Sequence, residues 1–359
     1  MVKQSISLLI TFCSFISFAQ TDYGQLANQY HLDIVTPPEQ GIGAREAGTK
    51  EEKRTAEYII QQLSDMGYQV TEQDFSFGKK QLSSKNIIVN TNTALKKTIV
   101  LGAHYDSTAK DHGSLGATDN GAGIAALLAI AKAMKSNEQL AYNIRFIAFG
   151  AEEVGLKGAK HYVSVLSKNQ QQLDNIIAMI NFDTIAGGDF TYVHSAHTKP
   201  YQCDLPDQEY NSDKQVRDAL LAASKEQLGK ESQYVIHPDY PGYPEGVTGS
   251  WSDHAPFACA GIPIAYVEST NFTINGKDGF DGYSQTTNPK LWDCFDDKNI
   301  TACDRATEKK WGNIWHTEFD RIDRLEALFP GRISKQIADN VQVLIALLSN
   351  FNDYVAVKN

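Results

Sequence analysis

The distribution of apolar and polar residues along the chain predicts strands that alternate with helices. Three runs are apolar almost throughout, which is typical of strands buried on both faces: 98–103 (TIVLGA), 143–149 (NIRFIAF) and 175–182 (NIIAMINF). Between the first two lies 120–134 (NGAGIAALLAIAKAM), which is apolar nearly all round, and we expect a buried helix there. Residues 155–166 predict a second connecting helix. The order strand, helix, strand, helix, strand indicates a doubly wound α/β sheet.

The flanking segments extend this pattern. A helix is predicted at 49–67, because Thr49 and Glu52 form a capping-box pair and Gly67 follows the last apolar position. The remaining expected elements are strands at 68–77, 83–90 and 261–269, a helix at 214–228, and a closing helix after Pro330. We expect the aromatic, irregular stretch 271–313 to form a long loop region over the functional site. We find no internal repeat, so we expect one catalytic domain.

The first nineteen residues, MVKQSISLLITFCSFISFA, have a different character from the rest of the chain. Lys3 precedes an apolar stretch that ends in the small residues Ser17 and Ala19. This pattern predicts a secretory signal peptide over 1–19, cleaved before Gln20, and the stretch is short for a membrane span. We therefore expect a secreted or periplasmic protein whose catalytic domain covers 20–359.

Charge and cysteine content narrow the function classes. The formal net charge of −10 becomes −11 once Lys3 is removed, and phosphate binding needs clustered positive charge, so we expect no nucleic-acid partner. We expect no membrane partner either, and a monomer. Four cysteines remain after processing, and we expect a disulfide between Cys294 and Cys303. Cys259 lies in an apolar run as a small buried residue, and its pairing with Cys203 stays open.

Ionisable residues fall just past the ends of the buried strands: His104 and Asp106 (HYD), Asp119 (TDNGAG), Glu152 and Glu153 (AEEVGLKG) and Asp183 (NFD). Taken singly, each has an ordinary structural explanation as a core histidine, a turn residue or a strand-end carboxylate. Their shared topological position favours function, because ligands of open α/β sheets bind at the carboxyl ends of the strands. Converging carboxylates repel one another unless a cation is present, and histidine with carboxylate suits zinc. The spacing of HYD lets Asp106 orient the ring of His104.

These motifs, together with WHT at His316, resemble in order and spacing the co-catalytic dizinc aminopeptidases of the M28 peptidase family. The resemblance covers essentially all of the mature chain. It implies a single α/β domain with a mixed, mostly parallel twisted sheet of about eight strands and helices on both faces. It also implies a cis peptide bond between Asp119 and Asn120.

The resemblance also implies a set of site residues. The implied ligands are His104 and Asp183 for one zinc ion, Glu153 and His316 for the other, and Asp119 as a bridge between them, with Glu152 as the general base. Two zinc ions per chain would polarise the peptide carbonyl and lower the pKa of water. Glu152 would take the proton of that water and pass it to the departing amine. One zinc can receive a free α-amine, so the implied substrates are peptides with a free N-terminus.

Some positions depart from the pattern or carry no assignment. Relatives often have tyrosine before the WHT histidine, where its hydroxyl can stabilise an oxyanion; here Trp315 leaves that role to the indole N–H or to another donor. Ser252, Asp253 and His254 are consecutive and so cannot form a nucleophile triad. We expect them at the rim of the site, beside the metal ligands, or in a structural role. Five further histidines lack a supporting pattern and are expected at the surface: His112, His161, His194, His197 and His237.

Several functional alternatives remain open. A glutaminyl-cyclase-like acyltransferase shares the implied fold, but those relatives use one zinc and lack the first histidine. A non-catalytic domain would have lost its ligands. A carboxypeptidase or dipeptidase of the same family would need a cationic clamp for the substrate carboxylate. The segments SDHAPF, VESTNF and GKDGFDGYSQ resemble periplasmic aminopeptidases of the alkaline-phosphatase isozyme-conversion type. That resemblance implies a preference for basic N-terminal residues, with a broad or leucine-type preference as the competitor.

Overall fold

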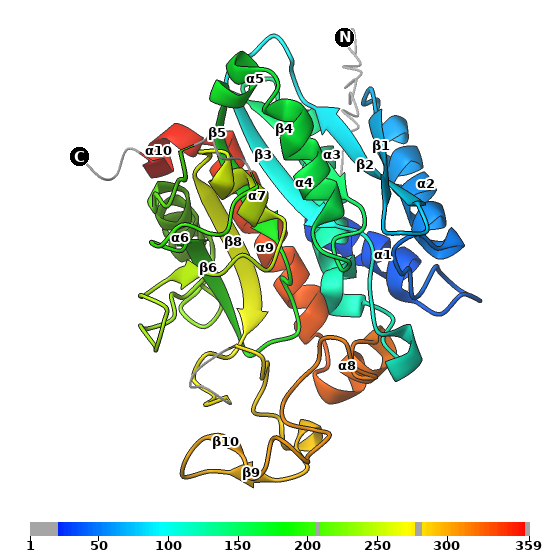
Figure 1. Cartoon of the computed structure of the whole chain (residues 1–359), viewed down its shortest axis with the longest axis vertical. Helices are drawn as coiled ribbons and strands as arrows, with labels where there is room; N and C mark the ends of the chain where they lie inside the picture. The colour runs from blue at the N-terminus through cyan, green and yellow to red at the C-terminus, as the bar shows by residue number, and fades with distance from the viewer. Residues whose placement is uncertain (1–20, 205–208, 277–281, 356–359) are drawn as a thin grey trace, which may run out of the picture.

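A twisted eight-stranded sheet forms the centre of the molecule (Figure 1). The computed structural model describes residues 21–204, 209–276 and 282–355, so the predicted signal peptide lies outside the described residues. The strands are β1 (Thr71–Phe77), β2 (Leu82–Asn90), β3 (Thr98–His104), β4 (Asn143–Phe149), β5 (Ile176–Phe182), β6 (Phe190–Ala196), β7 (Val247–Thr248) and β8 (Ile264–Thr270). They lie in the order β1-β2-β4-β3-β5-β8-β6-β7.

The four central strands β4, β3, β5 and β8 run parallel. Within this block Val100 of β3 lies opposite Arg145 of β4 on one side and Met179 of β5 on the other. Antiparallel pairing joins β1 to β2, β2 to β4, and β6 to β8, whereas β7 pairs parallel to β6. All seven residues of β3 are buried, as a strand covered on both faces requires. The predicted mixed, mostly parallel α/β sheet is confirmed.

Helices cover both faces of the sheet. One face carries α1 (Tyr23–Val35), α2 (Lys50–Asp65), α3 (Gly123–Lys135), α6 (Gln215–Gln227) and α9 (Arg332–Ser349). The other face carries α4 (Lys157–Leu166), α5 (Gln170–Asp174) and α7 (His254–Cys259). The short helices α8 (Ile322–Leu328) and α10 (Phe351–Val355) lie near the C-terminus. In α3 all residues except Lys132 and Lys135 are buried, which explains why its sequence is apolar nearly all round.

The N-terminus of α2 forms as the sequence predicts, with one difference. Thr49 is the N-cap, and its hydroxyl accepts a hydrogen bond from the backbone N–H of Glu52 at 3.2 Å. The carboxylate of Glu52 accepts from the N–H of Gly48 at 2.5 Å, one residue before the position of a capping box. Its other oxygen accepts from the hydroxyl of Ser84 at 2.5 Å, which ties α2 to β2.

Two disulfides are present. The predicted bond between Cys294 and Cys303 is confirmed, and Cys203 is bonded to Cys259. Cys259 ends α7 and is 6% exposed, so it is both a buried residue and a cross-link. This second bond ties α7 to a segment 56 residues earlier in the chain.

The irregular stretch after β8 lies beyond the carboxyl-terminal edge of the sheet (Figure 1). It contains the short pair β9 (Phe295–Asp296) and β10 (Thr301–Ala302), held together by Cys294–Cys303. Gly282 and Tyr283 of this stretch line the pocket described below, as a loop region over the site should. Within the described residues, no helix combines the length and apolar character that a membrane crossing requires.

Candidate metal centre

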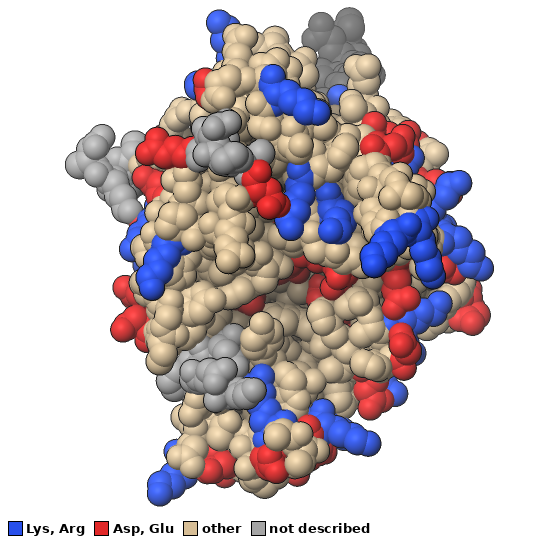
Figure 2. Space-filling model, in the orientation of Figure 1, with Lys and Arg blue, Asp and Glu red and all other residues tan. Residues whose placement is uncertain are grey.

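The predicted site residues meet at the carboxyl ends of the parallel strands. His104 ends β3, Asp183 follows β5, the two glutamates follow β4, and His316 arrives from the C-terminal part of the chain. A pocket of about 340 Å³ contains Asp119, Glu152, Glu153, Asp183 and His316 in its lining. Figure 2 shows a hollow across this face with acidic side chains at its floor and mostly uncharged residues around it.

The loop that carries the two glutamates is shaped by glycines. The N–H of Gly158 donates to the carbonyl of Gly150 at 3.0 Å. A Cβ built on Gly158 would lie 2.6 Å from that oxygen, so a larger residue cannot approach in this way. Gly155 has a φ of +104°, which L-residues rarely adopt. The sequence therefore holds Glu152 and Glu153 in a tight turn directly after β4.

Asp119 lies in the turn before α3. The side-chain amide of Asn120 donates to the carbonyl of Phe182 at 2.6 Å, so this turn is tied to the end of β5, beside Asp183. The peptide bond between Asp119 and Asn120 is cis, as the family resemblance implies, and the bond between Asp183 and Thr184 is cis as well. The hydrogen bond from Asn120 to Phe182 thus holds together two loops that are distant in sequence.

His104, Asp119 and Asp183 form one group of donor atoms. Nε2 of His104 lies 3.2 Å from Oδ1 of Asp119 and 3.2 Å from Oδ1 of Asp183. The imidazole is 1% exposed, so water cannot solvate it freely. Nε2 of His104 therefore lies close to one oxygen of each of the two aspartates.

His316, Asp119 and Glu153 form a second group. Nε2 of His316 lies 3.0 Å from Oδ2 of Asp119 and 3.4 Å from Oε2 of Glu153. Asp119 therefore contributes Oδ1 to the first group and Oδ2 to the second. One carboxylate shared through its two oxygens is the arrangement that two neighbouring cations require.

The donor groups fit zinc. Ligands at about 2.0 Å from a tetrahedral zinc ion lie about 3.3 Å from one another, and the contacts of the two groups span 3.0–3.4 Å. Oε1 of Glu153 is buried and has no hydrogen-bond partner among the described residues, so it is available to a cation. Donor atoms of His104, Asp119 and Glu153 all lie within 4.8 Å of one another.

Asp106 lies beneath this centre. The Nδ1 atom of His104 is 3.2 Å from the backbone carbonyl oxygen of Asp106 and 3.6 Å from its Oδ1. The backbone N–H groups of Glu152 and Glu153 donate to Oδ1 and Oδ2 of Asp106 at 2.9 and 3.1 Å. The backbone of Asp106 therefore contacts the imidazole most closely, and its carboxylate anchors the glutamate loop.

The electrostatics of the centre favour a bound cation. Burial raises the pKa of Glu153 to about 7, and the charge of Asp119 acts in the same direction. Burial also raises the pKa of Glu152 well above its ordinary value. Burial acts to lower the pKa of His316, but its contacts with Asp119 and Glu153 raise it to about 11. The shifts of both glutamates show that negative charge is costly here without a cation.

Residues 86–341 match the family model described as Peptidase family M28. The chain belongs to peptidase family M28. Membership identifies it as a peptide hydrolase. It is 27% identical over 352 residues to the alkaline phosphatase isozyme conversion protein of Escherichia coli, with 90% of each chain covered.

Solved structures share the fold of this M28 peptidase. BSAP, a zinc aminopeptidase from Bacillus subtilis, superposes with a TM-score of 0.62 at 17% identity, covering 91% of this chain and 95% of BSAP. A glutaminyl cyclase of Porphyromonas gingivalis gives a TM-score of 0.58 at 18% identity, covering 91% and 96% of the two chains. The fold alone therefore does not separate peptide hydrolysis from glutaminyl cyclisation.

Two further side chains hold the donor residues in place. The buried carboxylate of Asp320 accepts from the N–H and hydroxyl of Thr118 at 2.6 and 2.8 Å, and from the N–H of Asp119 at 3.3 Å. Ser252 donates its hydroxyl to Oδ2 of Asp183 at 2.6 Å. Asp320 stands four residues after His316 in the sequence, and this spacing does not predict its hydrogen bonds.

Arg45 was missed by the sequence analysis. Its guanidinium is fully buried and donates to the carbonyl oxygens of Tyr105, Leu115 and Gly116 at 2.7–2.9 Å. It links the segment after β3 to the segment before Asp119. A lone arginine near the N-terminus carries no motif, so no pattern in the sequence indicated this role.

The predictions for Ser252, Asp253 and His254 are only partly right. All three residues have 0% exposure, so a position at the rim is wrong. Ser252 lies beside a donor residue, whereas Nε2 of His254 contacts the carbonyl of Gly249 at 2.8 Å. Burial raises the pKa of Asp253 well above its ordinary value.

The surface prediction is wrong for three of the five unassigned histidines. His194, His197 and His237 are 1%, 9% and 0% exposed, whereas His112 is exposed and His161 is half-buried. His194 lies on β6 and packs against the rings of Tyr266, Phe272 and His237. The polar residues of 190–196 gave no indication of a strand, although the aromatic side chains of this strand pack into the core.

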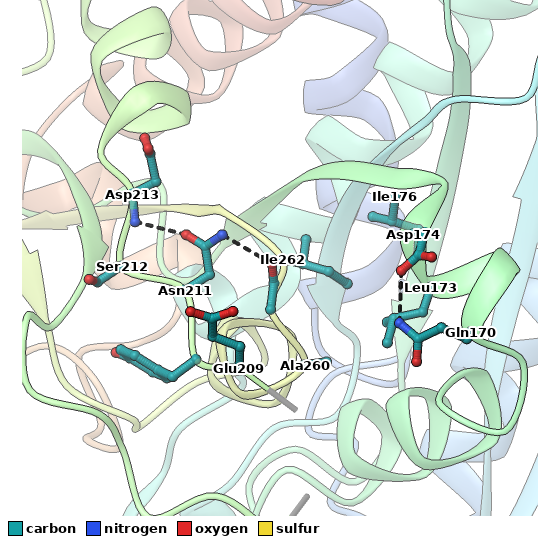
Figure 3. A pocket seen from close by; sticks show the side chains of 12 residues that line it. Gln170, Leu173, Asp174, Ile176, Glu209, Asn211, Ser212, Asp213, Ala260 and Ile262 are labelled. Atoms are coloured by element: carbon teal, nitrogen blue, oxygen red, sulfur yellow. Dashed lines mark hydrogen bonds between the residues drawn. The ribbon is translucent and has the colours of Figure 1, made fainter. Parts of the chain in front are cut away.

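A second cavity, of about 770 Å³, lies near the beginnings of β5 and β8, away from these residues (Figure 3). Its polar groups bond to one another: Gln170 donates to Asp174, and Asn211 accepts from the N–H of Asp213. None of the predicted site residues lines it.

Proposed function

We propose that this chain is an exported zinc aminopeptidase that removes N-terminal residues from peptides. Zinc aminopeptidases are among the structures that share its fold, and the chain belongs to a peptidase family. The single observation that carries the two-metal assignment is the division of Asp119 between two donor groups, Oδ1 toward His104 and Oδ2 toward His316. His104 and Asp183 would hold one zinc ion, Glu153 and His316 the other, and Asp119 both.

Bound zinc ions supply the Lewis acidity that polarises a peptide carbonyl and acidifies water. Glu152 is the general base: its carboxylate takes a proton from the attacking water and returns it to the departing amine. Asp106 accepts the N–H of Glu152 at 2.9 Å and thereby fixes the base next to Glu153.

The remaining residues orient the reacting groups. Ser252 fixes Asp183, and Asp320 fixes the turn that carries Asp119. The indole N–H of Trp315 is buried, lacks a hydrogen-bond partner among the described residues, and belongs to a side chain that lines the pocket. It is our candidate donor to the oxyanion, in the position where relatives often carry tyrosine.

The pocket favours an aminopeptidase over a carboxypeptidase. Among its described lining residues there is no lysine or arginine that could clamp a substrate carboxylate. Lys309 and Lys310 line an adjoining cavity, which shares Tyr283, Trp315 and His316 with the pocket. A zinc ion with an open coordination position can receive the free α-amine of a peptide. We retain the expectations of a monomer and of a signal peptide cleaved before Gln20.

Metal content and end-group requirement test the proposal together. The metal-free protein, titrated with zinc, should recover full activity only after about two equivalents per chain. A peptide with an acetylated N-terminus should resist hydrolysis, whereas the same peptide with an amidated C-terminus should be cut. Full activity with one zinc ion, or cleavage of the acetylated peptide, would contradict it. Cyclisation of N-terminal glutamine in place of hydrolysis would identify the alternative that shares the fold.

A further inference from the structure

The metal pocket adjoins a cavity of about 780 Å³. The side chains of Tyr283, Trp315 and His316 line both spaces, so the two spaces meet beside the metal centre. In the proposed function the scissile bond lies next to the metal ions. The N-terminal residue of the substrate then occupies the metal pocket, and the residues after the scissile bond extend into the adjoining cavity.

The two spaces differ in charge. Acidic side chains line the metal pocket without a described lysine or arginine, whereas Lys309 and Lys310 line the adjoining cavity. Two carboxylates also line this cavity. Glu318 forms an ion pair with Arg324, so among the described lining residues only Asp293 remains to offset the two lysines. The adjoining cavity therefore carries an excess of positive charge where the departing part of the substrate lies.

Asp293 fixes the backbone of the lysine pair. Its Oδ2 accepts hydrogen bonds from the N–H groups of Lys309 at 2.9 Å and Lys310 at 3.1 Å, and its own N–H donates to the carbonyl of Lys310 at 2.9 Å. Those backbone N–H groups, and secondarily the charges of the two lysines, lower the pKa of Asp293. The disulfide Cys294–Cys303 begins at the next residue and closes the adjacent loop. Both lysines are thus held at one place, with one carboxylate for two ammonium groups.

The ammonium groups are accessible to a ligand. Neither forms an ion pair within the part of the chain that the structure describes. Lys309 is exposed and Lys310 is half-buried. Nζ of Lys310 lies 5.7 Å from the ring centroid of Phe319, which also lines the cavity. An ammonium group offers three donors and no acceptor, which suits a carboxylate.

We propose that Lys309 and Lys310 form a subsite for a carboxylate on the carboxyl side of the scissile bond. The proposal rests on the proposed aminopeptidase function and adds the substrate class: peptides with a negative charge shortly after the residue that is removed. This charge is either the C-terminal carboxylate of a short peptide or the side chain of a downstream aspartate or glutamate. Peptides without it are still cut, but more slowly, because the lysines contact only the departing part.

The first test varies only the charge at the C-terminus. Release of leucine is measured from Leu-Ala-Ala with a free C-terminus and from its C-terminal amide. Both peptides have the same N-terminal residue, so any preference for that residue cancels in their ratio. Wild-type enzyme should cut the free acid with a kcat/KM about 3- to 10-fold higher, mainly through a lower KM, as two exposed ion pairs would produce. The ratio should fall to about one in Lys309→Gln/Lys310→Gln and persist in Lys309→Arg/Lys310→Arg.

The second test identifies the source of the carboxylate. Leu-Ala-Glu-Ala amide and Leu-Ala-Gln-Ala amide differ only in a side-chain charge. A lysine-dependent preference for the free acid in the first pair assigns the subsite to the C-terminus of short peptides. The same preference for the glutamate peptide assigns it to an acidic side chain. Equal kcat/KM values within both pairs would overturn the proposal.

Lys290→Gln/Lys298→Gln is the matched control. Both lysines are exposed and line neither the metal pocket nor the adjoining cavity, yet their replacement changes the net charge equally. The ratio of free acid to amide should stay within about 1.5-fold of the wild-type ratio. A fall equal to that of Lys309→Gln/Lys310→Gln would mean that overall charge sets the preference, and this too would overturn the proposal.

Ionic strength provides a test on wild-type enzyme alone. Salt screens exposed charges, and the screening length is about 3 Å at 1 M. The ratio of free acid to amide should therefore approach one as sodium chloride is raised to about 1 M. A preference that salt leaves unchanged would contradict the lysine subsite. None of these outcomes refutes the aminopeptidase function, whereas release of no N-terminal residue from any of the peptides would do so.

Discussion

Asp106→Asn perturbs the support of the metal centre without removing a donor or the base. The carboxylate of Asp106 accepts two backbone N–H groups, from Glu152 at 2.9 Å and Glu153 at 3.1 Å. An asparagine amide can accept through only one atom, and its NH₂ group would face the second N–H. One buried donor thus loses its partner, at a cost of about 1–3 kcal/mol.

We expect this cost to lower the catalytic rate. The loop of Glu152 and Glu153 can restore its hydrogen bonds only by moving, and this displaces both the general base and a metal donor. Loss of such a support lowers activity or metal affinity about 10- to 100-fold, equivalent to about 1.4–2.7 kcal/mol. We expect kcat for an aminoacyl-coumarin amide to fall by this factor, with KM changed less than about threefold. Zinc retention against a chelator should weaken in parallel.

Asp33→Asn is the control for Asp106→Asn. Asp33 on α1 also accepts two hydrogen bonds, from Tyr58 at 2.7 Å and Gln29 at 2.8 Å, but lies outside the pocket. This variant should keep kcat within about twofold of wild type. If folded Asp106→Asn keeps the kcat and the zinc retention of the wild type, the reasoning is refuted. It is also refuted if the unfolded fraction of the variant accounts for its entire loss of activity.

Three further predictions concern the supporting structure. Asp320→Ala removes the acceptor of three hydrogen bonds and should weaken zinc binding about 10- to 100-fold in chelator competition; unchanged affinity would contradict its positioning role. Replacing Cys203 and Cys259 by serine opens a cross-link over 56 residues and should lower the free energy of unfolding in urea by about 4 kcal/mol, whereas a loss under about 1 kcal/mol would count against it. Burial lowers the pKa of His31 to about 4, so the unfolded chain, with a histidine pKa of about 6.5, binds the proton more tightly. The wild-type protein should therefore lose about 2 kcal/mol more stability than His31→Gln between pH 7 and pH 5, and equal losses would contradict this assignment.

The centre of the fold could be predicted because strands buried on both faces leave unbroken apolar runs. The residues after these runs were identified for the same reason: the carboxyl ends of parallel strands share one edge. β6 was not predicted because Phe190–Ala196 mixes aromatic with polar residues, and His194 was expected at the surface. Its burial depends on packing against β8, which local sequence does not encode.

The supporting contacts could not be predicted in the same way. The bonds from Asp320 to Thr118 and from Ser252 to Asp183 span 202 and 69 residues. Such partners are set by the three-dimensional course of the chain, and a single sequence carries no record of them. The motif spacing indicated which residues approach the centre, while the packing of the loops determines which atoms face one another.

Glu152→Gln tests the central claim most directly. The substitution keeps the size of the side chain and removes its ability to take a proton. We expect about two zinc ions per chain to be retained while kcat falls by a factor on the order of 10² to 10⁴. Glu153→Gln, the neighbouring control, should lose zinc instead. Turnover of Glu152→Gln near that of wild type, or loss of its zinc, would contradict the division of this pair into a base and a metal ligand.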